Sequence, residues 1–242
     1  TMENDFQKIT PPCLLCGVSA QLFGSKWGYH LYRCPSCRFL FVFPVPVDVS
    51  SVYDEGYFTG GDAGVGYADY DRDKAPMSKS FTQYCALIER LYPQKGTLFD
   101  VGAATGFFLG VARARGWHVS GVEVSPYAAR IAQQKGFDVR IADFSSLALV
   151  PNSFDVITMF DVLEHFSRPL QELQTAFRVL KPGGLLVINT PDASSFFAIL
   201  FGIRWHLIVP PEHLYYFNST NCARLLRSLG FRVRYSGKIW KS

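Results

Sequence analysis

The feature that most constrains the fold is an alternation of apolar and helical segments from residue 97 onward. The apolar segments are TLFDV (97–101), HVSGVEV (118–124), FDVRIA (137–142), FDVITMF (154–160) and LLVINT (185–190). Helical patterns over 107–115, 126–135 and 170–180 separate most of them. Nearly continuous apolar strands are typical of a parallel sheet that is buried on both faces. The sequence therefore predicts a doubly wound α/β domain over 96–242, with a mostly parallel sheet and helices on both faces.

The last part of the chain predicts one more helix and one more strand. Ser219 is expected to cap a helix over 221–230, and FRVRYS over 231–236 reads as a strand. Sheets of this kind often end in an antiparallel hairpin, for which one strand is missing here. We therefore expect a C-terminus that is truncated or disordered.

Four of the six cysteines form two C-x-x-C pairs, Cys13 with Cys16 and Cys34 with Cys37. This spacing lets both thiolates of a tight turn face one ion, and four thiolates make a closed tetrahedral set without an open position for catalysis. Redox chemistry would need only one pair. We therefore predict a structural zinc ion (Zn²⁺) in a zinc-ribbon module over residues 1–47.

Residues 48–95 connect this module to the predicted sheet. The stretch before Pro76 is rich in glycine and tyrosine, and a helical pattern follows over 77–92. We expect a linker or lid whose aromatic residues close over a substrate or pack on the sheet domain; they are Tyr53, Tyr57, Phe58, Tyr67 and Tyr70. The prediction for the zinc module is that it anchors this segment near the substrate.

Charge and hydropathy limit the other possibilities. The formal net charge is +4, with few basic residues near the cysteine pairs, which argues against nucleic acid as a partner. No secretion signal or transmembrane segment is recognised, so a cytoplasmic setting is expected. The most apolar stretch, 196–209, is too short to span a membrane, and we expect a partly buried helix and lid rather than an interfacial anchor.

A glycine-containing turn, DVGAATGFF over 100–108, follows the first predicted strand of the sheet. Such a turn lets the backbone approach a ligand closely. A dinucleotide fingerprint would need glycine at 102, 104 and 107, but the chain has Gly102, Ala104 and Phe107. No G-x-x-x-x-G-K-[ST] occurs either. The spacing therefore weighs against both NAD and ATP.

This turn resembles the first motif of the class I S-adenosylmethionine-dependent methyltransferases, with alanine in place of its middle glycine. The resemblance implies a Rossmann-like methyltransferase sheet, S-adenosyl-L-methionine as cofactor and S-adenosyl-L-homocysteine as product. Glu123 would accept hydrogen bonds from the ribose hydroxyls and Asp143 from the adenine amino group. The implied cofactor-binding residues are Asp100, Gly102, Ala103, Thr105, Gly106, Glu123, Asp143, Phe144, Phe160 and Asp161.

Three later motifs resemble the ubiquinone-biosynthesis O-methyltransferase subgroup and its zinc-ribbon-bearing relatives. They are LEH (163–165), LKPGG (180–184) and the P-x-H-x-x-x-F pattern of Pro211, His213 and Phe217. The resemblance associates Asp161, Glu164 and His165 with a divalent ion, and their i, i+3, i+4 spacing would share one helical face. Because Mg²⁺ prefers oxygen ligands, we favour a role in organising the helix start and cofactor pocket, and leave the metal open.

Methyl transfer to a hydroxyl needs a base, and histidine suits this role. His213 is the first candidate for a catalytic base and His165 the second. The expected activity is O-methylation of a small molecule such as a sugar, glycolipid precursor or secondary metabolite. Two alternatives stay open: an RNA base methyltransferase, because some rRNA enzymes carry a similar zinc module, and a cofactor-binding scaffold without catalysis. The oligomeric state is not predicted.

Overall fold

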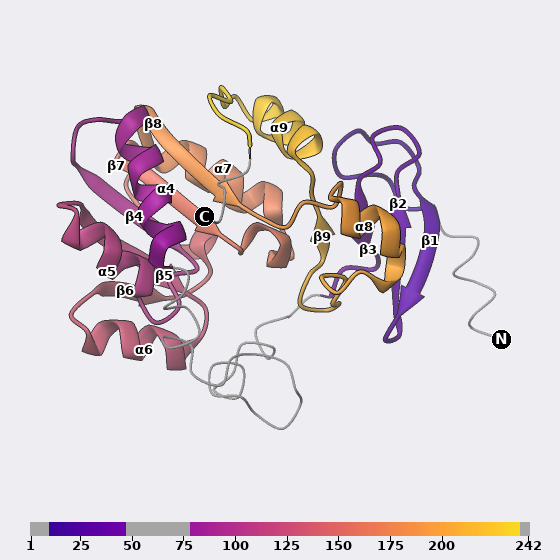
Figure 1. Ribbon diagram of the computed structural model, residues 1–242, viewed down its shortest axis with the longest axis horizontal. Helices are drawn as coiled ribbons and strands as arrows, with labels where there is room; N and C mark the ends of the chain where they lie inside the picture. Colours follow the sequence, from indigo (N-terminus) through magenta and orange to yellow (C-terminus); the bar gives the residue numbers. More distant parts are fainter. Residues whose placement is uncertain (1–9, 47–77, 238–242) are drawn as a thin grey trace. The chain divides into compact units, whose positions relative to one another are not determined.

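The structure is a computed structural model that describes residues 10–46 and 78–237 (Figure 1). The predicted tyrosine-rich linker lies outside these residues. The described residues form two compact units. We call residues 10–46, 163–169 and 190–236 the cysteine unit, and residues 78–162 with 170–189 the sheet unit.

The sheet unit contains five parallel strands in the order β6-β5-β4-β7-β8. The strands are β4 (Thr97–Val101), β5 (His118–Glu123), β6 (Asp138–Ile141), β7 (Phe154–Phe160) and β8 (Leu180–Asn189). β4 pairs with β5 on one side and with β7 on the other. The strand order therefore reverses at β4, and in sheets of this type ligands bind where the reversal occurs, at the carboxyl ends of the strands.

Helices flank this sheet, as Figure 1 shows, with α4, α5 and α6 on one face and α7 on the other. Their bounds are α4 (Ser78–Leu91), α5 (Phe107–Ala114), α6 (Pro126–Gln134) and α7 (Pro169–Val179). Ser125 caps α6 through its hydroxyl, and Pro126 occupies the first turn, where its missing N–H costs nothing. The prediction of a Rossmann-like sheet flanked by helices is confirmed.

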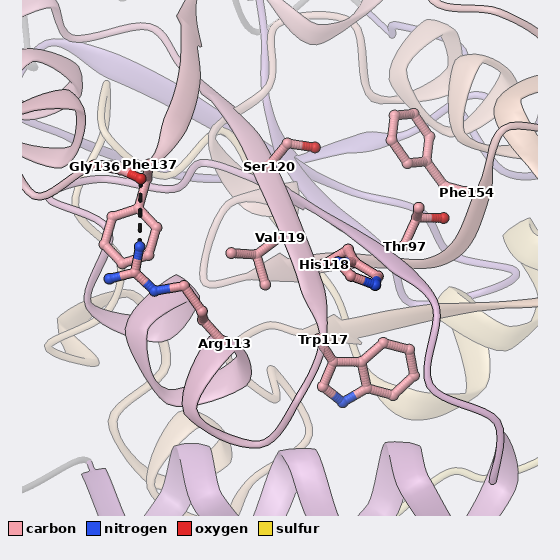
Figure 2. Close-up of a pocket in the computed structure, with 9 residues that line it drawn as sticks. All are labelled: Thr97, Arg113, Trp117, His118, Val119, Ser120, Gly136, Phe137 and Phe154. Atoms are coloured by element: carbon pink, nitrogen blue, oxygen red, sulfur yellow. Dashed lines mark hydrogen bonds between the residues drawn. The ribbon is translucent and has the colours of Figure 1, made fainter.

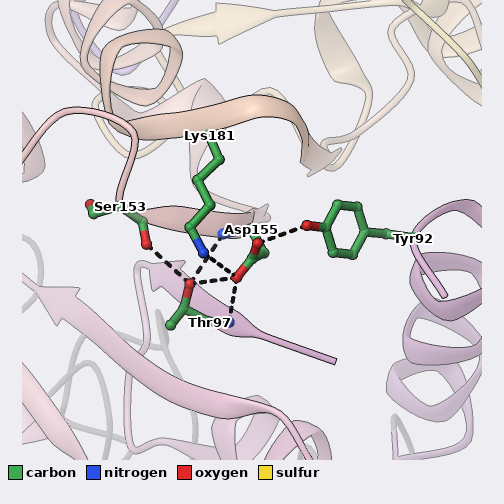
Figure 3. Close-up of polar contacts among 5 residues, drawn as sticks. All are labelled: Tyr92, Thr97, Ser153, Asp155 and Lys181. Atoms are coloured by element: carbon green, nitrogen blue, oxygen red, sulfur yellow. Dashed lines mark hydrogen bonds and ion pairs between the residues drawn. The ribbon is translucent and has the colours of Figure 1, made fainter. Parts of the chain in front are cut away.

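A buried carboxylate ties together the amino-terminal ends of three strands in this sheet (Figure 3). Asp155 accepts hydrogen bonds from the Tyr92 hydroxyl at 2.7 Å and from the Lys181 ammonium at 2.8 Å. The backbone N–H of Thr97 donates to the same carboxylate at 2.8 Å. Burial alone would raise the pKa of Asp155, but these donors hold it well below its ordinary value.

The cysteine unit contains an antiparallel sheet in the order β1-β2-β3-β9. Its strands are β1 (Gln21–Lys26), β2 (Tyr29–Arg33), β3 (Leu40–Val42) and β9 (Tyr215–Tyr216). Leu40 pairs with Tyr216 and Phe41 with Tyr215, so the front of the chain pairs with a segment near its other end. The sequence did not predict this pairing.

Two expectations for the end of the chain are wrong. Asn218, not Ser219, caps α9 (Ser219–Ser228), because its side chain accepts from the Asn221 N–H while the Asn221 side chain accepts from the Asn218 N–H. This reciprocal pair satisfies two backbone donors at once. Residues 231–236, which lie in the described part of the chain, do not form the predicted strand.

The apolar stretch after β8 also differs from expectation. It forms α8 (Phe196–Phe201) and the 3₁₀ helix η5 (Gly202–Arg204). Instead of a partly buried helix, α8 exposes most of its apolar side chains, and only Ala198 is buried. The described residues therefore leave these apolar side chains of α8 uncovered.

Candidate cofactor and catalytic sites

The turn after β4 adopts a left-handed backbone at every second residue. The φ angles are 79° at Gly102, 46° at Ala104 and 80° at Gly106. Glycine adopts such angles freely, whereas alanine pays a steric cost. At Gly106 a Cβ would also lie 2.8 Å from the Phe137 ring. The turn thus needs both of its glycines, Gly102 and Gly106, and holds the backbone of Ala104 under strain.

Glu123, the last residue of β5, holds this turn through hydrogen bonds to backbone N–H groups. Its Oε2 accepts the N–H of Ala104 at 2.8 Å, and its Oε1 accepts the N–H of Ser125 at 2.9 Å. Burial raises the pKa of Glu123, while these N–H donors oppose the rise. The carboxylate therefore holds the strained turn in place, and a backbone contact from Val124 adds to these two. A carboxylate offers about four lone pairs, so three donors leave capacity for a ligand hydroxyl.

Asp100 lies deeper, inside β4. Its carboxyl is buried and accepts a hydrogen bond from the Thr158 hydroxyl of β7 at 2.6 Å. Burial raises the pKa of Asp100 to about 8, against the lowering effect of that hydroxyl. Asp100 therefore links the two strands that flank the switch point, and its direct contact with a cofactor stays a prediction.

Asp143 and Phe144 follow β6, at the same edge of the sheet. Asp143 occupies the N-cap position of η3 (Phe144–Ser146), yet its side chain makes no capping hydrogen bond. The carboxylate is therefore not used as a helix cap and is able to accept a hydrogen bond from a ligand. The Phe144 ring is buried and packs on Phe99 with 5.6 Å between centroids, so its main contact is with the core.

A hydrogen-bonded chain at the ends of β7 and β8 was missed by the sequence reasoning. Tyr84 of α4 donates to Asn189 at 2.8 Å, and the Asn189 amide donates to Asp161. The Tyr84 ring stacks on Phe160 with 4.7 Å between centroids. Burial and the nearby Asp161 raise the pKa of Tyr84 to about 12, which keeps its hydroxyl protonated as a donor. No local motif marks Tyr84 or Asn189, because they meet only in the folded chain.

The four strand ends together favour one kind of ligand. Acidic side chains stand at or just after the ends of four neighbouring strands, namely Asp100, Glu123, Asp143 and Asp161. Acidic groups disfavour a phosphate and suit a ligand with hydroxyls, amino groups or positive charge. These four carboxylates therefore fit a nucleoside that carries a cationic sulfonium better than they fit a dinucleotide.

A second cluster lies in the cysteine unit and joins Glu164, His165 and His213. Their ligand-capable atoms all lie within 4.8 Å of one another. The imidazole rings of the two histidines meet edge to face at 4.8 Å, and Glu164 accepts from the Thr190 hydroxyl at 2.8 Å. Both the preferred base and the second candidate thus belong to one cluster. One carboxylate and two imidazoles are also a ligand set able to hold a divalent ion.

The two imidazoles are oriented in the same way. Nδ1 of His165 lies 2.7 Å from the Glu212 carbonyl, and Nδ1 of His213 lies 2.8 Å from the Leu207 carbonyl. Because a carbonyl only accepts, each Nδ1 donates a proton to it, and a ring that is neutral then has its lone pair on Nε2. Burial lowers the pKa of His213 to about 4, so its imidazole is neutral near pH 7.

The expected shared helical face of Asp161, Glu164 and His165 is wrong. Asp161 has a left-handed φ of 52°, and η4 (Leu163–His165) begins two residues later. The left-handed residue interrupts the helical path, so the i, i+3, i+4 relation does not hold. The third partner of Glu164 and His165 is instead His213.

The two cysteine pairs converge as predicted. The Sγ atoms of Cys13 and Cys37 lie 3.5 Å apart, those of Cys16 and Cys34 3.4 Å, and those of Cys16 and Cys37 3.8 Å. A tetrahedral zinc ion with Zn–S bonds of about 2.3 Å requires S–S separations of about 3.8 Å. Each pair also directs a backbone N–H at a sulfur, from Leu15 to Cys13 and from Cys37 to Cys34. The donor set fits structural zinc.

The cysteine cluster and the histidine cluster are connected through one strand pair, β3 with β9. Phe39, just beyond Cys37, stacks on Tyr215 within 7° of parallel, and the Val42 N–H donates to the Leu214 carbonyl at 2.9 Å. Leu214 in turn donates its N–H to the Glu164 carbonyl at 2.8 Å. Contacts thus run without a gap from the cysteines to Glu164 and His213.

A pocket elsewhere in the sheet unit opens at the amino-terminal ends of the strands (Figure 2). Its lining includes Thr97, Trp117, His118 and Phe154. Arg113 lies over the Phe137 ring at 4.1 Å and donates to the Gly136 carbonyl at 3.3 Å, so its charge is already engaged. The candidate cofactor residues lie at the other edge of the sheet, and we assign this pocket no role.

Comparisons with known proteins agree with the geometry of the sheet. Residues 77–236, more than half of the chain, match the methyltransferase domain family. An uncharacterised protein of Methanocaldococcus jannaschii is 28% identical over 149 residues, which cover 61% of this chain and 70% of that protein. A ubiquinone biosynthesis O-methyltransferase of Paracidovorax citrulli is 28% identical over 155 residues, which cover 60% of this chain. The match spans 65% of that enzyme, less than two thirds of its length.

A solved structure shares the fold. A SAM-dependent methyltransferase of Thermotoga maritima, described as a possible histamine N-methyltransferase, superposes with a TM-score of 0.55 at 24% identity. The superposition covers 68% of this chain and 77% of that one. At this identity the likeness concerns the fold alone.

Proposed function

Because the chain belongs to the methyltransferase domain family and has the family's Rossmann-like sheet, we propose that it methylates a hydroxyl of a small molecule, with S-adenosylmethionine as donor. The observation that carries the proposal is the turn of Gly102, Ala104 and Gly106, bonded to Glu123 at the strand-order reversal. The cofactor, when bound, supplies an electrophilic methyl group on a sulfonium.

The sheet unit supplies the cofactor site in this proposal. Glu123 would accept from the ribose hydroxyls through its remaining lone pairs, and Asp143 from the adenine amino group. Asp161, held by Asn189 and Tyr84, would carry a fixed negative charge near the methionine portion. Asp100 would act by positioning the turn rather than by contact.

The histidine cluster supplies the base. Neutral His213, whose Nδ1 donates to the Leu207 carbonyl, presents an unprotonated Nε2, the form needed to accept a proton from a hydroxyl. His165, oriented in the same way by the Glu212 carbonyl, would act likewise when its ring is neutral. The Glu164 carboxylate lies 3.9 Å from Nε2 of His165 and would stabilise the imidazolium formed there.

The cysteine cluster is given a positioning role. A zinc ion bound to Cys13, Cys16, Cys34 and Cys37 would fix β3, and β3 holds β9 beside His213. The earlier expectation, that the module anchors the tyrosine-rich segment, concerns residues outside those described and stays a prediction.

The experiment is calorimetry with S-adenosylmethionine, followed by a methyl-transfer assay over hydroxylated acceptors: sugars, glycolipid precursors and phenolic secondary metabolites. Glu123→Gln should weaken cofactor binding, and Asp138→Asn, an exposed carboxylate of β6, should not. Binding without transfer to any acceptor would support a scaffold without catalysis, and absence of binding would contradict the cofactor site.

A further inference from the structure

Helix α8 is apolar on all sides and yet exposed. Its sequence is FFAILF, and Ala198 is its only buried residue. The exposed fractions of the other five side chains are 72% for Phe196, 58% for Phe197, 72% for Ile199, 60% for Leu200 and 50% for Phe201. Helices that are hydrophobic all round are normally buried in a protein core or in lipid. An exposed apolar surface of this kind indicates a site that binds a partner or a membrane.

The helix is held on the cysteine unit through β1. Ile203, in η5 directly after α8, fills the space beside Gly24, where its Cδ1 lies 2.5 Å from the position of a Cβ. β1 and η5 are in contact, and η5 follows α8 directly along the chain (Figure 1). A side chain at residue 24 would require the Ile203 side chain to move, so the glycine permits this packing.

The hairpin that ends β1 carries an exposed tryptophan. Trp27 lies at the turn with a left-handed φ of 51° and is 64% exposed, three residues beyond Gly24. Bulky residues rarely adopt this backbone, and such strain tends to occur at functional positions. The Lys26 ammonium lies 4.7 Å from the Trp27 ring. Tryptophan beside a cationic side chain is typical of the membrane–water interface.

The charge of the same unit selects among possible partners. The described residues of the cysteine unit include nine lysines and arginines against three aspartates and glutamates, one of which, Glu164, is buried. Arg204 and His206 follow α8 directly and are exposed. An excess of positive charge opposes a second copy of the same surface and attracts anionic phosphates. Five exposed aliphatic and phenyl groups suit acyl chains and do not suit the phosphate backbone of RNA.

We propose that α8 and the tip of the β1–β2 hairpin dock the protein on the surface of an anionic lipid bilayer. The apolar side chains of α8 enter the boundary between headgroups and acyl chains, and Lys26 and Arg204 face the lipid phosphates. Within residues 10–46 and 78–237, no helix has both the length and the apolarity to cross a bilayer. In this proposal the association is peripheral and reversible.

The test is flotation of the full chain with vesicles of phosphatidylcholine alone or mixed with phosphatidylglycerol. We expect binding to the mixed vesicles, weakened about tenfold or more by Phe197→Ser with Leu200→Ser. Lys26→Gln with Arg204→Gln should reduce both the affinity and its salt dependence. Phe177→Ser, at a 49% exposed phenylalanine of α7 in the sheet unit, is the matched control and should not change binding.

Three results would overturn the proposal. One is failure to bind the mixed vesicles. Another is a dimer in sedimentation analysis that the α8 double variant dissociates, which would identify a second copy as the cover. The third is salt-sensitive binding of RNA in place of vesicles. Cofactor calorimetry on the α8 variant should match the unaltered chain, which separates this test from that of the methyltransferase activity.

Discussion

The imidazole of His165 meets the imidazole of His213 edge to face, with ring centroids 4.8 Å apart. Both rings donate from Nδ1 to backbone carbonyls, so removing either ring should affect proton transfer more than cofactor binding. We expect His213→Ala and His165→Ala each to lower kcat by about 100-fold or more. The affinity for S-adenosylmethionine in calorimetry should stay within about twofold. His206→Ala, at an exposed histidine of the same unit, is the control. Loss of cofactor affinity in the first two variants would indicate a structural role.

His213 also predicts a pH dependence of stability. Its pKa in the folded chain is lowered to about 4 from the ordinary 6.5. Between these values the unfolded chain binds a proton that the folded chain does not, so stability falls as the pH drops from 6.5 to 4. Over this pH range, the free energy of unfolding should fall by up to about 3 kcal/mol less in the His213→Asn variant than in the unaltered protein. Urea unfolding measures both. Parallel pH profiles of the two proteins would contradict the assignment.

Ala104 offers a stabilising substitution. Its φ of 46° costs an alanine about 1 kcal/mol, and glycine avoids that cost. Part of the gain is lost because glycine is more flexible in the unfolded chain. We expect Ala104→Gly to leave stability unchanged or raise it by up to about 1 kcal/mol in urea unfolding. We also expect it to tighten cofactor binding. Ala103→Gly, at a neighbouring buried alanine that has no positive φ, should destabilise, and the same response at both positions would argue against strain at Ala104.

Asp155 should contribute strongly to stability. It is buried and receives hydrogen bonds from Tyr92, Thr97 and Lys181, which depress its pKa. Asp155→Asn should cost about 2–4 kcal/mol near pH 7. A carboxylate whose pKa is lowered by folding stabilises the protein fully only above its pKa in the unfolded chain, which is near 4. The difference in stability between the two proteins should therefore shrink as the pH falls below 4. Urea unfolding at several pH values measures it. Asp138→Asn is the exposed control, and a difference that persists in acid would point to packing instead.

The contacts from the cysteines to Glu164 predict an effect of metal removal at a distance. Chelation, or Cys34→Ser, should loosen β3 and with it β9, and lower kcat. Cofactor affinity should remain, because the proposed cofactor residues belong to the sheet unit. Hydrogen exchange of the Val42 and Leu214 amides should report the loosening directly. Cys222→Ala, outside the cluster, should leave both readouts unchanged. Exchange rates that do not respond to chelation would disprove the coupling.

The sequence was informative wherever a structure depends on neighbours along the chain. Apolar runs and helix signals predicted the five strands and the four α-helices of the sheet unit, because burial on both faces imposes a local pattern. The 3₁₀ helix η3 was not predicted, and β8 begins at Leu180, five residues before the predicted strand. The C-x-x-C spacing likewise predicted the convergence of four sulfurs. Asn218 and Ser219 are both good caps, and only the reciprocal bonds with Asn221 decide between them.

What the sequence did not reveal depends on contacts between distant residues. Tyr84 and Asn189 carry no motif, and the joining of Glu164 with His213 needs β9 beside η4. The exposure of α8 was also hidden, since an apolar run reads alike whether the fold covers it or not. The left-handed turn at Asp161 broke a helical relation that spacing alone suggested.

The pairing of Leu40 with Tyr216 has a consequence for biosynthesis. During translation the four clustered cysteines, at residues 13 to 37, are made long before residues 215 and 216, which pair with the edge of β3. During that interval every strand of the sheet unit is synthesised, while an unpaired strand edge is a risk for aggregation. Early capture of a metal would hold the first strands in shape until β9 arrives. The supply of the metal during translation would then influence how much of the protein reaches its native state.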